Sequence, residues 1–268
     1  MTDPLVTSMG STAKQDNEER GATEVARDTD NGGNKEIMDN VNRKPQFHNF
    51  SSEEWCAKWE NKTALWHLEE LHPVLEKHAD KMIAGREGIR ILVPFCGKDI
   101  GMKWLADMNH EVVGVEFSEL AIKDFFADHE LTYTCEDLPR NGGKLFTACD
   151  IKIRIYCCDF YQSKQYIVTR FDAVWDRGGL TAANRTDHRR YADTVVSLIC
   201  EDCRYLLVVF EYDDTLYSGP PSNINETTVF DLYKDKFSIE KIDSNDAMNE
   251  RRKRWGVDCV NEVVYLMH

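Results

Sequence analysis

Long apolar runs are missing from this sequence of 268 residues. No stretch approaches the roughly 20 apolar residues that a membrane-spanning helix needs. The first residues, MTDPLVTSMGSTAKQDNEER, have no apolar run behind a basic patch, and their Asp and Glu content is unlike that of a mitochondrial transit peptide. These absences predict a cytoplasmic protein that does not associate with membranes.

Basic residues are scarce relative to acidic ones. The chain has 33 Lys and Arg against 47 Asp and Glu, which gives a formal net charge of -14. A surface of this sign repels a phosphate backbone, so nucleic acid is excluded as a partner. A small, weakly charged ligand is admitted more easily, and we expect a monomer that acts on a small molecule.

The sequence also lacks a disulfide or metal framework. It has nine cysteines, an odd number, and several lie inside apolar runs such as IRIYCCDF. Buried, reduced thiols are the interpretation that fits this pattern. Cys200 and Cys203 form a C-x-x-C, but a zinc site would need a second pair or His ligands at suitable spacing. We therefore expect structural thiols and no metal.

Aromatic residues are absent before Phe47, and residues 1–45 are rich in Gly, Asn, Asp, Glu and Thr. Such a segment buries too little apolar surface to offset the entropy lost on ordering. We predict a disordered polar tail over residues 1–45 and a single domain over residues 46–268.

Within that domain, patterns typical of strands and helices alternate. A helix is predicted to start at Ser51 or Ser52, because Glu54 follows at capping-box spacing. A second is expected over His67–Ala84, interrupted early by Pro73. Further segments are strands near 89–94, 111–116, 144–150, 151–160 and 171–177, helices near 100–108, 118–130 and 188–200, and late strands near 204–212, 236–242 and 257–267. The alternation predicts an α/β fold with a mostly parallel sheet, helices on both faces and an antiparallel C-terminal edge.

Three residues that end or follow strands are candidates for ligand binding, because such sheets bind ligands at the carboxyl ends of their strands. Gly97 follows the first strand, but no G-x-G-x-x-G accompanies it, so a dinucleotide site is poorly supported. Glu116 ends the second strand, where an acid binds ribose hydroxyls or caps the next helix. Asp159 ends a later strand, where it either accepts from an adenine amino group or is an ordinary strand-end acid.

Two further groups of residues carry chemistry. The segment WDRGGL places Asp176 and Arg177 at the carboxyl end of a strand. Arg177 either binds a ligand carboxylate through two hydrogen bonds or forms an ion pair with Asp176. Trp55, Trp59 and Trp66 precede the first strand; they are either core residues or an aromatic cover that attracts a cationic sulfonium and excludes water.

Together these motifs resemble the thiopurine S-methyltransferase family. The resemblance runs from about residue 50 to residue 266 and is carried by EEWCAKWENKTALWH, ILVPFCGKDIGMKWLAD, HEVVGVEFSELAI, IYCCDF, FDAVWDRGGL, RRYADTV, SGPP and RRKRWGVDC. It implies a Rossmann-like fold of S-adenosylmethionine-dependent methyltransferases. It also implies methylation of aromatic or heterocyclic thiols such as 6-mercaptopurine, by direct in-line transfer with S-adenosylhomocysteine as product and no metal.

By position, the resemblance assigns residues to the donor and the acceptor. The residues implied to bind the cofactor are Trp55, Trp59, Trp66, Phe95, Gly97, Glu116, Asp159, Phe160 and Arg177. The residues implied to bind the substrate are Trp66, Pro220, Pro221 and Arg251. Arg177 is the implied catalytic residue, at the mouth of the active site.

Departures from the vertebrate pattern concentrate on the acceptor side. Trp66 replaces a Phe, Ser222 stands where an aromatic is common, and Arg252 replaces a His. They keep open a related methyltransferase for small thiols, selenium, tellurium or halide. Two further hypotheses are a non-catalytic S-adenosylmethionine-binding module and a nicotinamide oxidoreductase. The retained WDRG speaks against the module, and the missing G-x-G-x-x-G speaks against the oxidoreductase.

Overall fold

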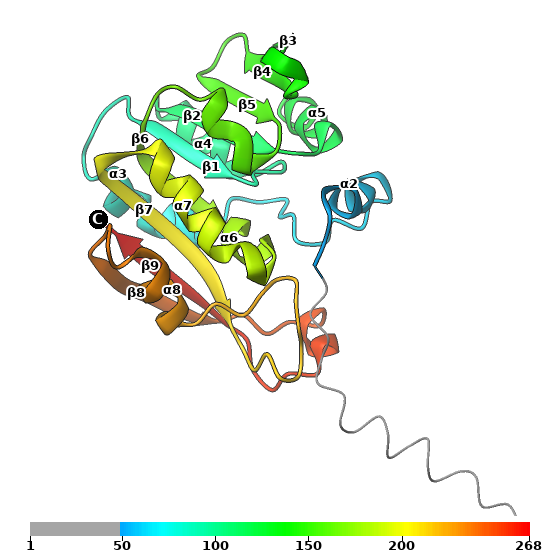
Figure 1. The fold of residues 1–268 in the computed structure, drawn as a ribbon, viewed down its shortest axis with the longest axis vertical. Helices are drawn as coiled ribbons and strands as arrows, with labels where there is room; N and C mark the ends of the chain where they lie inside the picture. Colours follow the sequence, from blue (N-terminus) through cyan, green and yellow to red (C-terminus); the bar gives the residue numbers. More distant parts are fainter. Residues whose placement is uncertain (1–48) are drawn as a thin grey trace, which may run out of the picture. The chain divides into compact units, whose positions relative to one another are not determined.

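A computed structural model describes residues 49–268 (Figure 1). The predicted tail over residues 1–45 and its boundary lie outside the described residues. In the described part, nine strands form one sheet in the order β3-β4-β5-β2-β1-β6-β7-β9-β8. Their bounds are β1 Arg90–Pro94, β2 Glu111–Glu116, β3 Tyr133–Asp137, β4 Lys144–Ala148, β5 Ile153–Cys157, β6 Phe171–Arg177, β7 Ile199–Glu211, β8 Ile239–Asp246 and β9 Asn261–Met267.

Helices connect most of these strands. The α-helices are α2 Ser52–Glu60, α3 Pro73–Ile83, α4 Ile100–Asp107, α5 Glu119–Asp128, α6 Gly179–Ala182, α7 His188–Leu198 and α8 Glu226–Tyr233. Short 3-10 turns are η1 Pro139–Asn141, η2 Phe160–Gln165, η3 Arg185–Asp187 and η4 Arg252–Trp255. None of the helices described is long and apolar enough to cross a membrane.

The sheet is parallel in its middle and antiparallel at both edges. Strands β5, β2, β1, β6 and β7 pair in parallel, and β9 and β8 add the antiparallel edge that the sequence predicts. The other edge, β3 with β4 and β4 with β5, is also antiparallel, and the sequence did not predict it. All five side chains of β3 are exposed, so this strand carries no apolar pattern that marks it.

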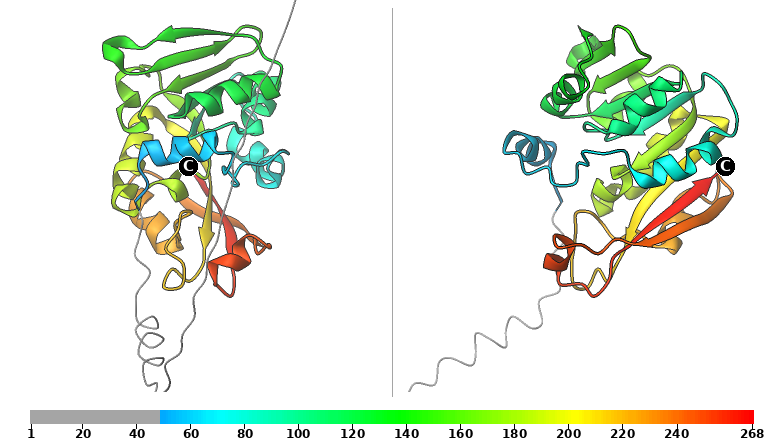
Figure 2. Two further views of the ribbon diagram at one scale, coloured as in Figure 1. Left: turned by 90° about the vertical axis from the view of Figure 1, so that its right-hand side faces the viewer. Right: turned by 180° about the vertical axis from the view of Figure 1, so that it is seen from behind.

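The central strands are buried on both faces. In β6, Ala173 and Trp175 point to the layer of α3, α4 and α5, whereas Val174 between them points to α6, α7 and α8. Side chains alternate along a strand, so near-continuous apolar runs are what a parallel sheet covered on both sides requires. Figures 1 and 2 show the helices on either side of the sheet.

Local signals in the sequence fix several helix starts. Ser51 and Glu54 form the predicted capping box of α2, with Ser51 Oγ accepting from the Glu54 amide and the Glu54 side chain accepting from the Ser51 amide. Ser118 caps α5 as predicted. The second helix is shorter than expected: it begins at Pro73, and residues 61–72 form neither helix nor strand (Figure 2). Proline favours the first turn of a helix, because its missing N–H has no partner there and its fixed φ is already helical, so α3 begins at Pro73.

All nine cysteines lie in the described part of the chain and are free thiols. Cys203 is buried and Cys200 is half-buried. Burial raises the pKa of Cys203 to about 12, so its thiol stays protonated near neutral pH. These observations fit the structural interpretation of the C-x-x-C.

Candidate active site

Several of the residues singled out from the sequence lie at the carboxyl ends of β1, β2 and β6. These three strands lie side by side in the sheet, in the order β2-β1-β6. Phe95 and Gly97 follow β1, Glu116 ends β2 and Arg177 ends β6. A cavity at this edge is lined by five of the predicted residues, Trp59, Trp66, Phe95, Gly97 and Arg177.

Gly97 and Glu116 are joined by a hydrogen bond. The Gly97 amide donates to Glu116 Oε2 at 2.9 Å, and the Ser118 amide donates to Glu116 Oε1 at 2.7 Å. Burial raises the pKa of Glu116, while these backbone amides pull it down. The predicted helix-start contact of Glu116 is therefore present. A carboxylate has about four lone-pair sites, so Glu116 can still accept hydrogen bonds from a ligand.

Gly97 needs to be a glycine for two reasons. Its φ is +49°, in the left-handed region that other residues rarely adopt. A side-chain carbon built on it would lie 2.9 Å from the Trp59 ring. The backbone turn after β1 thus brings the indole of Trp59 directly onto the peptide at Gly97.

The three tryptophans pack on one another above this turn. The Trp66 ring meets Trp55 edge-on at 5.2 Å between centroids and Trp59 at 5.6 Å. Trp59 is 9% exposed, and the other two are half-buried. We call these three residues the tryptophan cover. The tryptophan cover thus packs on the backbone turn after β1, and two of its rings line the cavity there.

Two arginines hold the segment that carries the cover. Arg177 Nη1 donates to the Trp66 carbonyl oxygen at 2.7 Å, and Arg251 Nη1 donates to the carbonyl of the preceding residue, Leu65. Burial lowers the pKa of Arg177, and the carboxylates of Asp99 and Glu262 oppose that change. The sequence-based predictions listed Arg177 as catalytic and cofactor-binding and Arg251 as substrate-binding, and did not include these contacts with the segment of the cover.

Asp159 and Phe160 lie beside Phe95 at the start of η2. Asp159 Oδ1 accepts from the Tyr161 amide at 2.9 Å, so this strand-end acid caps the turn. The Phe160 ring is 2% exposed and packs edge-on against Phe95 at 5.4 Å. The Phe160 ring therefore belongs to the core cluster beside β6 and α7.

Pro220 and Pro221 lie in a loop whose carbonyl groups accept hydrogen bonds from two tyrosine side chains. Tyr217 Oη donates to the Pro220 carbonyl at 2.7 Å, and Tyr212 Oη donates to the Pro221 carbonyl at 2.6 Å. The amide of Ser222 donates to a carbonyl of α6 at 2.7 Å, and Ser222 is 5% exposed. This loop does not line the cavity beneath the tryptophan cover.

Asp176 does not pair with Arg177, which was the simple alternative for these neighbours. Its Oδ1 accepts from the Gly179 amide at 2.9 Å, and its Oδ2 accepts from Tyr191 Oη at 2.8 Å and Tyr205 Oη at 2.6 Å. Asp176 is fully buried, so all of these bonds form away from water. They fix the turn from which Arg177 leaves β6.

A family model described as Thiopurine S-methyltransferase (TPMT) matches residues 50–268. The chain belongs to the thiopurine S-methyltransferase family. The thiopurine S-methyltransferase of Mus musculus is 41% identical over 216 residues, covering 80% of this chain and 90% of that protein. The probable thiopurine S-methyltransferase of Danio rerio is 42% identical over 217 residues, covering 80% and 93%.

A solved structure supports the fold. The 1,6-didemethyltoxoflavin-N1-methyltransferase of Burkholderia thailandensis, with bound 1,6-didemethyltoxoflavin and S-adenosylhomocysteine, has a TM-score of 0.54 and 15% identity, and the match covers 81% of this chain and 86% of that chain. At this identity the likeness concerns the fold alone. The expected Rossmann-like methyltransferase fold is confirmed, and as a family member the chain is an enzyme that uses S-adenosylmethionine as methyl donor.

The chemical groups at the carboxyl ends of β1 and β2 are suited to binding S-adenosylmethionine. Glu116 has lone pairs left for ribose hydroxyls, and Gly97 contributes no side chain of its own to the backbone turn. The cavity itself is about 50 Å³, whereas ligand sites usually measure roughly 300–1,000 Å³. Trp59 and Trp66 both line this cavity beside Gly97.

The sequence-based predictions missed the other lining residues, which are His67, Leu68, Glu70, His72, Cys96, Lys98, Asp99 and Ile100. Asp99 caps α4, accepting from the Gly101 amide at 2.7 Å and from Trp175 Nε1 at 2.8 Å. An acid just before a helix was a readable signal for Asp99. His72 and His67 precede α3 without any pattern that marks them as part of a site.

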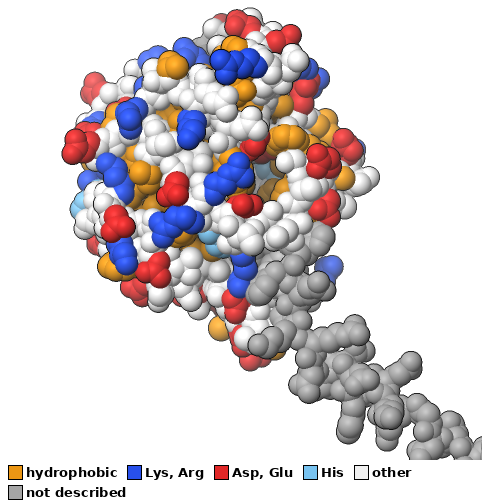
Figure 3. All heavy atoms as spheres, in the orientation of Figure 1, with side chains coloured by type: hydrophobic (Ala, Val, Ile, Leu, Met, Phe, Trp, Pro, Cys, Tyr) orange, Lys and Arg blue, Asp and Glu red, His pale blue; other side chains and the backbone are white. Residues whose placement is uncertain are grey.

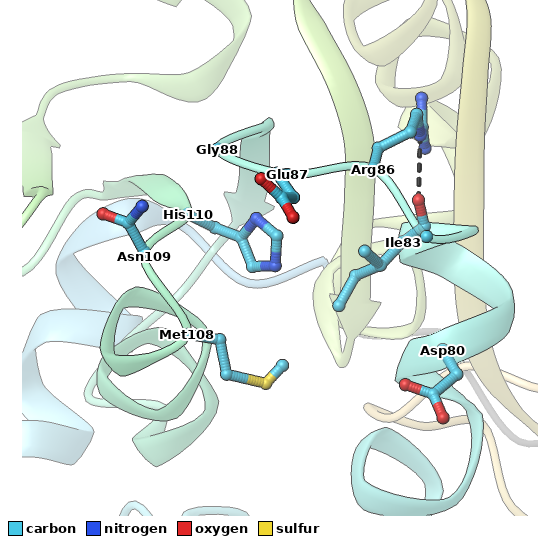
Figure 4. Close-up of a pocket in the computed structure, with 9 residues that line it drawn as sticks. Asp80, Ile83, Arg86, Glu87, Gly88, Met108, Asn109 and His110 are labelled. Carbon is cyan, nitrogen blue, oxygen red and sulfur yellow. Dashed lines mark hydrogen bonds between the residues drawn. The ribbon is translucent and has the colours of Figure 1, made fainter.

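A second, larger cavity of about 450 Å³ lies at the opposite edge of the sheet, before β1 and β2 (Figure 4). Figure 4 shows the ring of His110 between Ile83, Met108 and Glu87. Burial lowers the pKa of His110, so its ring stays neutral near pH 7. None of the residues predicted to bind donor or acceptor lines this cavity. Among the described residues, no group of three or more His, Cys, Asp or Glu is placed to hold a metal ion.

Proposed function

We propose that this enzyme transfers the methyl group of S-adenosylmethionine to the sulfur of aromatic or heterocyclic thiols, with thiopurines such as 6-mercaptopurine as substrates. The observation that carries the proposal is the meeting of Gly97, Glu116 and Arg177 at one edge of the sheet, beneath the tryptophan cover. The names of the relatives from mouse and zebrafish point to the same acceptor class.

Donor binding is proposed for residues on both sides of the turn after β1. Glu116 accepts from the ribose hydroxyls, and Asp159 with the backbone of Phe160 contacts the adenine. Phe95, Gly97 and Arg177 lie along the methionine part, and the tryptophan cover, Trp55, Trp59 and Trp66, encloses the sulfonium. Electron-rich rings favour a cation at short range, and closing them over the site excludes water.

Acceptor binding is proposed for Trp66, Pro220, Pro221 and Arg251. A thiolate is the reactive form of a sulfur nucleophile, and an aromatic thiol is acidic enough to supply it. When bound, S-adenosylmethionine supplies an electrophilic methyl group. The protein then has to align the sulfur with that methyl group in a dry pocket, which accounts for a large share of such rate enhancements. Arg177 is the proposed catalytic residue, because its positive charge favours the thiolate.

The test combines turnover and binding. Methyl transfer from labelled S-adenosylmethionine to 6-mercaptopurine is measured beside calorimetric binding of S-adenosylhomocysteine. Arg177→Ala should lower kcat more than it weakens donor binding, whereas Glu116→Gln should weaken donor binding. Glu136→Gln, on the exposed strand β3, is the matched control and should leave both unchanged. Equal losses of turnover and binding in Arg177→Ala would remove Arg177 from the proposed role.

One observation favours a second acceptor class. Trp66 carries a larger ring than Phe and lines a narrow cavity, which suits an acceptor smaller than a purine. Small thiols, selenium and tellurium species or halide are such nucleophiles. Competition of these acceptors against 6-mercaptopurine separates the two classes. Donor binding without any methylated product would instead identify a non-catalytic S-adenosylmethionine-binding module.

We also propose that the enzyme acts as a cytoplasmic monomer without nucleic-acid or membrane partners. The net charge of -14 and the interspersed acidic and basic side chains on the face drawn in Figure 3 support this. Light scattering coupled to size-exclusion chromatography tests the monomer directly, and a mass near twice 31.0 kDa would contradict it.

A further inference from the structure

The segment that carries the tryptophan cover, residues 50–66, is bonded to the domain near both of its ends. At its end, Arg177 Nη1 donates to the Trp66 carbonyl oxygen at 2.7 Å. At its start, the side chain of Asn184 bonds to the backbone of Phe50. Arg177 ends β6 and Asn184 follows α6, so both contacts come from the same short stretch of chain.

Asn184 makes two reciprocal hydrogen bonds with one residue. The Phe50 amide donates to Asn184 Oδ1 at 2.9 Å, and Asn184 Nδ2 donates to the Phe50 carbonyl oxygen at 3.1 Å. An asparagine side chain has both a donor and an acceptor, so it can pair with both backbone groups of a residue. Asn184 is half-buried. The next residue after Phe50 is Ser51, the N-cap of α2, so these bonds fix the backbone where α2 begins.

Ring contacts connect Phe50 to the donor site. The Phe50 ring lies 5.0 Å from the Trp55 ring between centroids, and Trp55 in turn meets Trp66. Trp66 meets Trp59, whose indole packs on the peptide at Gly97. A continuous set of contacts thus runs from the partner of Asn184 to the turn after β1. Asn184 itself does not line the cavity beneath the cover.

The element that carries Asn184 is fixed independently of the cover. Asp176 Oδ1 accepts from the amides of Gly179 and Leu180, at 2.9 Å and 3.4 Å, where α6 begins. The Ser222 amide donates to a carbonyl of α6 at 2.7 Å. Because α6 is bonded to both β6 and the loop before α8, Asn184 extends from a well-supported position.

Helix α2 has little buried surface of its own. Trp59 is the one buried residue among Ser52–Glu60. Elements with few buried apolar contacts open locally at a low cost in free energy. The hydrogen bonds at the two ends of the segment therefore matter more for its position than they would for a helix of the core.

We infer that Asn184 is a positioning residue for the methyl donor. By holding Phe50, it keeps the tryptophan cover closed over bound S-adenosylmethionine and sets how long the donor stays in the site. Asn184 acts through the position of α2, since it does not line the cavity. The inference rests on the proposed enclosure of the donor by the tryptophan cover.

The test measures donor-site kinetics without an acceptor. Surface plasmon resonance of S-adenosylhomocysteine over the immobilised enzyme gives the association and dissociation rate constants. Two hydrogen bonds of ordinary net strength change an opening equilibrium by roughly tenfold. Asn184→Ala should therefore raise the dissociation rate about tenfold and change the association rate little. Asn184→Asp still accepts from the Phe50 amide but cannot donate to its carbonyl, so its dissociation rate should be intermediate.

Hydrogen exchange separates a positioning role from a general structural one. In Asn184→Ala, the amides of α2 should exchange faster while those of the sheet stay at the wild-type rate. Asn245→Ala removes the same side chain from an exposed position on β8 and should change neither exchange nor dissociation. The inference is overturned by unchanged exchange in α2, by equally faster exchange in the sheet, or by an unchanged dissociation rate.

Glu116→Gln tests the proposed donor site separately. If it leaves S-adenosylhomocysteine binding unchanged, the proposed donor site is wrong. If it weakens binding while Asn184→Ala leaves dissociation at the wild-type rate, the donor site stands and the role of Asn184 is refuted. Because no acceptor is present, a lack of turnover with 6-mercaptopurine would count against the proposed acceptor alone.

Discussion

Replacing Asp176 with alanine should be among the most destabilising single changes in this enzyme. Tyr191 and Tyr205 both donate to Asp176, and both residues are fully buried. A buried polar group left without a partner costs about 1–3 kcal/mol. Tyr205 Oη lies 3.4 Å from Tyr233 Oη and can turn toward it, so the full cost falls mainly on Tyr191.

The loss of the Gly179 amide bond adds about 1 kcal/mol, and relief from burying a carboxylate subtracts a similar amount. The net expectation for Asp176→Ala is a loss of about 2 kcal/mol from a domain stability of roughly 5–15 kcal/mol. Asp176→Asn should cost less, because its amide oxygen still accepts from Gly179 and its amino group can donate to a tyrosine oxygen.

Urea unfolding at neutral pH measures these losses, and a double-mutant cycle isolates their cause. Tyr191→Phe should destabilise the wild type, because it removes a hydrogen bond to a carboxylate. In the Asp176→Ala background the same change removes a hydroxyl without a partner and should be neutral or stabilising. The reasoning is wrong if Asp176→Ala costs less than about 1 kcal/mol, or if Tyr191→Phe costs the same in both backgrounds.

Three other substitutions test separate parts of the structure. Ser51→Ala removes the cap of α2 and should cost about 1 kcal/mol locally, seen as faster amide exchange in α2 with unchanged exchange in the sheet. Gly97→Ala forces a side chain into a left-handed turn against Trp59 and should weaken S-adenosylhomocysteine binding at least tenfold by calorimetry. The hydrogen bond from His78 holds the pKa of Asp243 low. The charged Asp243 therefore stabilises the folded state above about pH 4, and this stabilisation is lost as the pH falls. Asp243→Asn should reduce the loss of unfolding free energy that urea titrations measure between about pH 7 and pH 3.

Much of the fold was predictable because its signals are local. The buried parallel strands are short apolar runs in the sequence. Ser51 and Ser118 mark helix starts, because their side chains accept hydrogen bonds from amides of the first turn. The ends of β1, β2 and β6 could be placed together because alternating strands and helices imply a parallel sheet. Gly97, Glu116 and Arg177 could therefore be identified as candidates from the sequence.

The features that escaped prediction depend on contacts between distant segments. Strand β3 has no buried side chain, so only its pairing with β4 defines it. The partners of Asp176 come from α7 and β7, and an ion pair with its neighbour Arg177 was the simpler expectation. His72 and Glu262 lie far apart in the sequence and meet only because β9 returns to pair with β7 in the sheet. No periodicity along the chain encodes such a meeting.

The contacts of Arg177 and Arg251 connect the two halves of the proposed reaction. Arg177 donates to the carbonyl of Trp66 and Arg251 to the carbonyl of the preceding residue, Leu65. Both arginines are also proposed to face the acceptor. A guanidinium has five N–H donors in a fixed plane, so it can hold the cover with one nitrogen while another faces the acceptor. Trp66 also lines the cavity beside Gly97, so the same ring is proposed to contact both the donor and the acceptor. Enclosure of the donor and alignment of the thiol should then depend on the same two arginines.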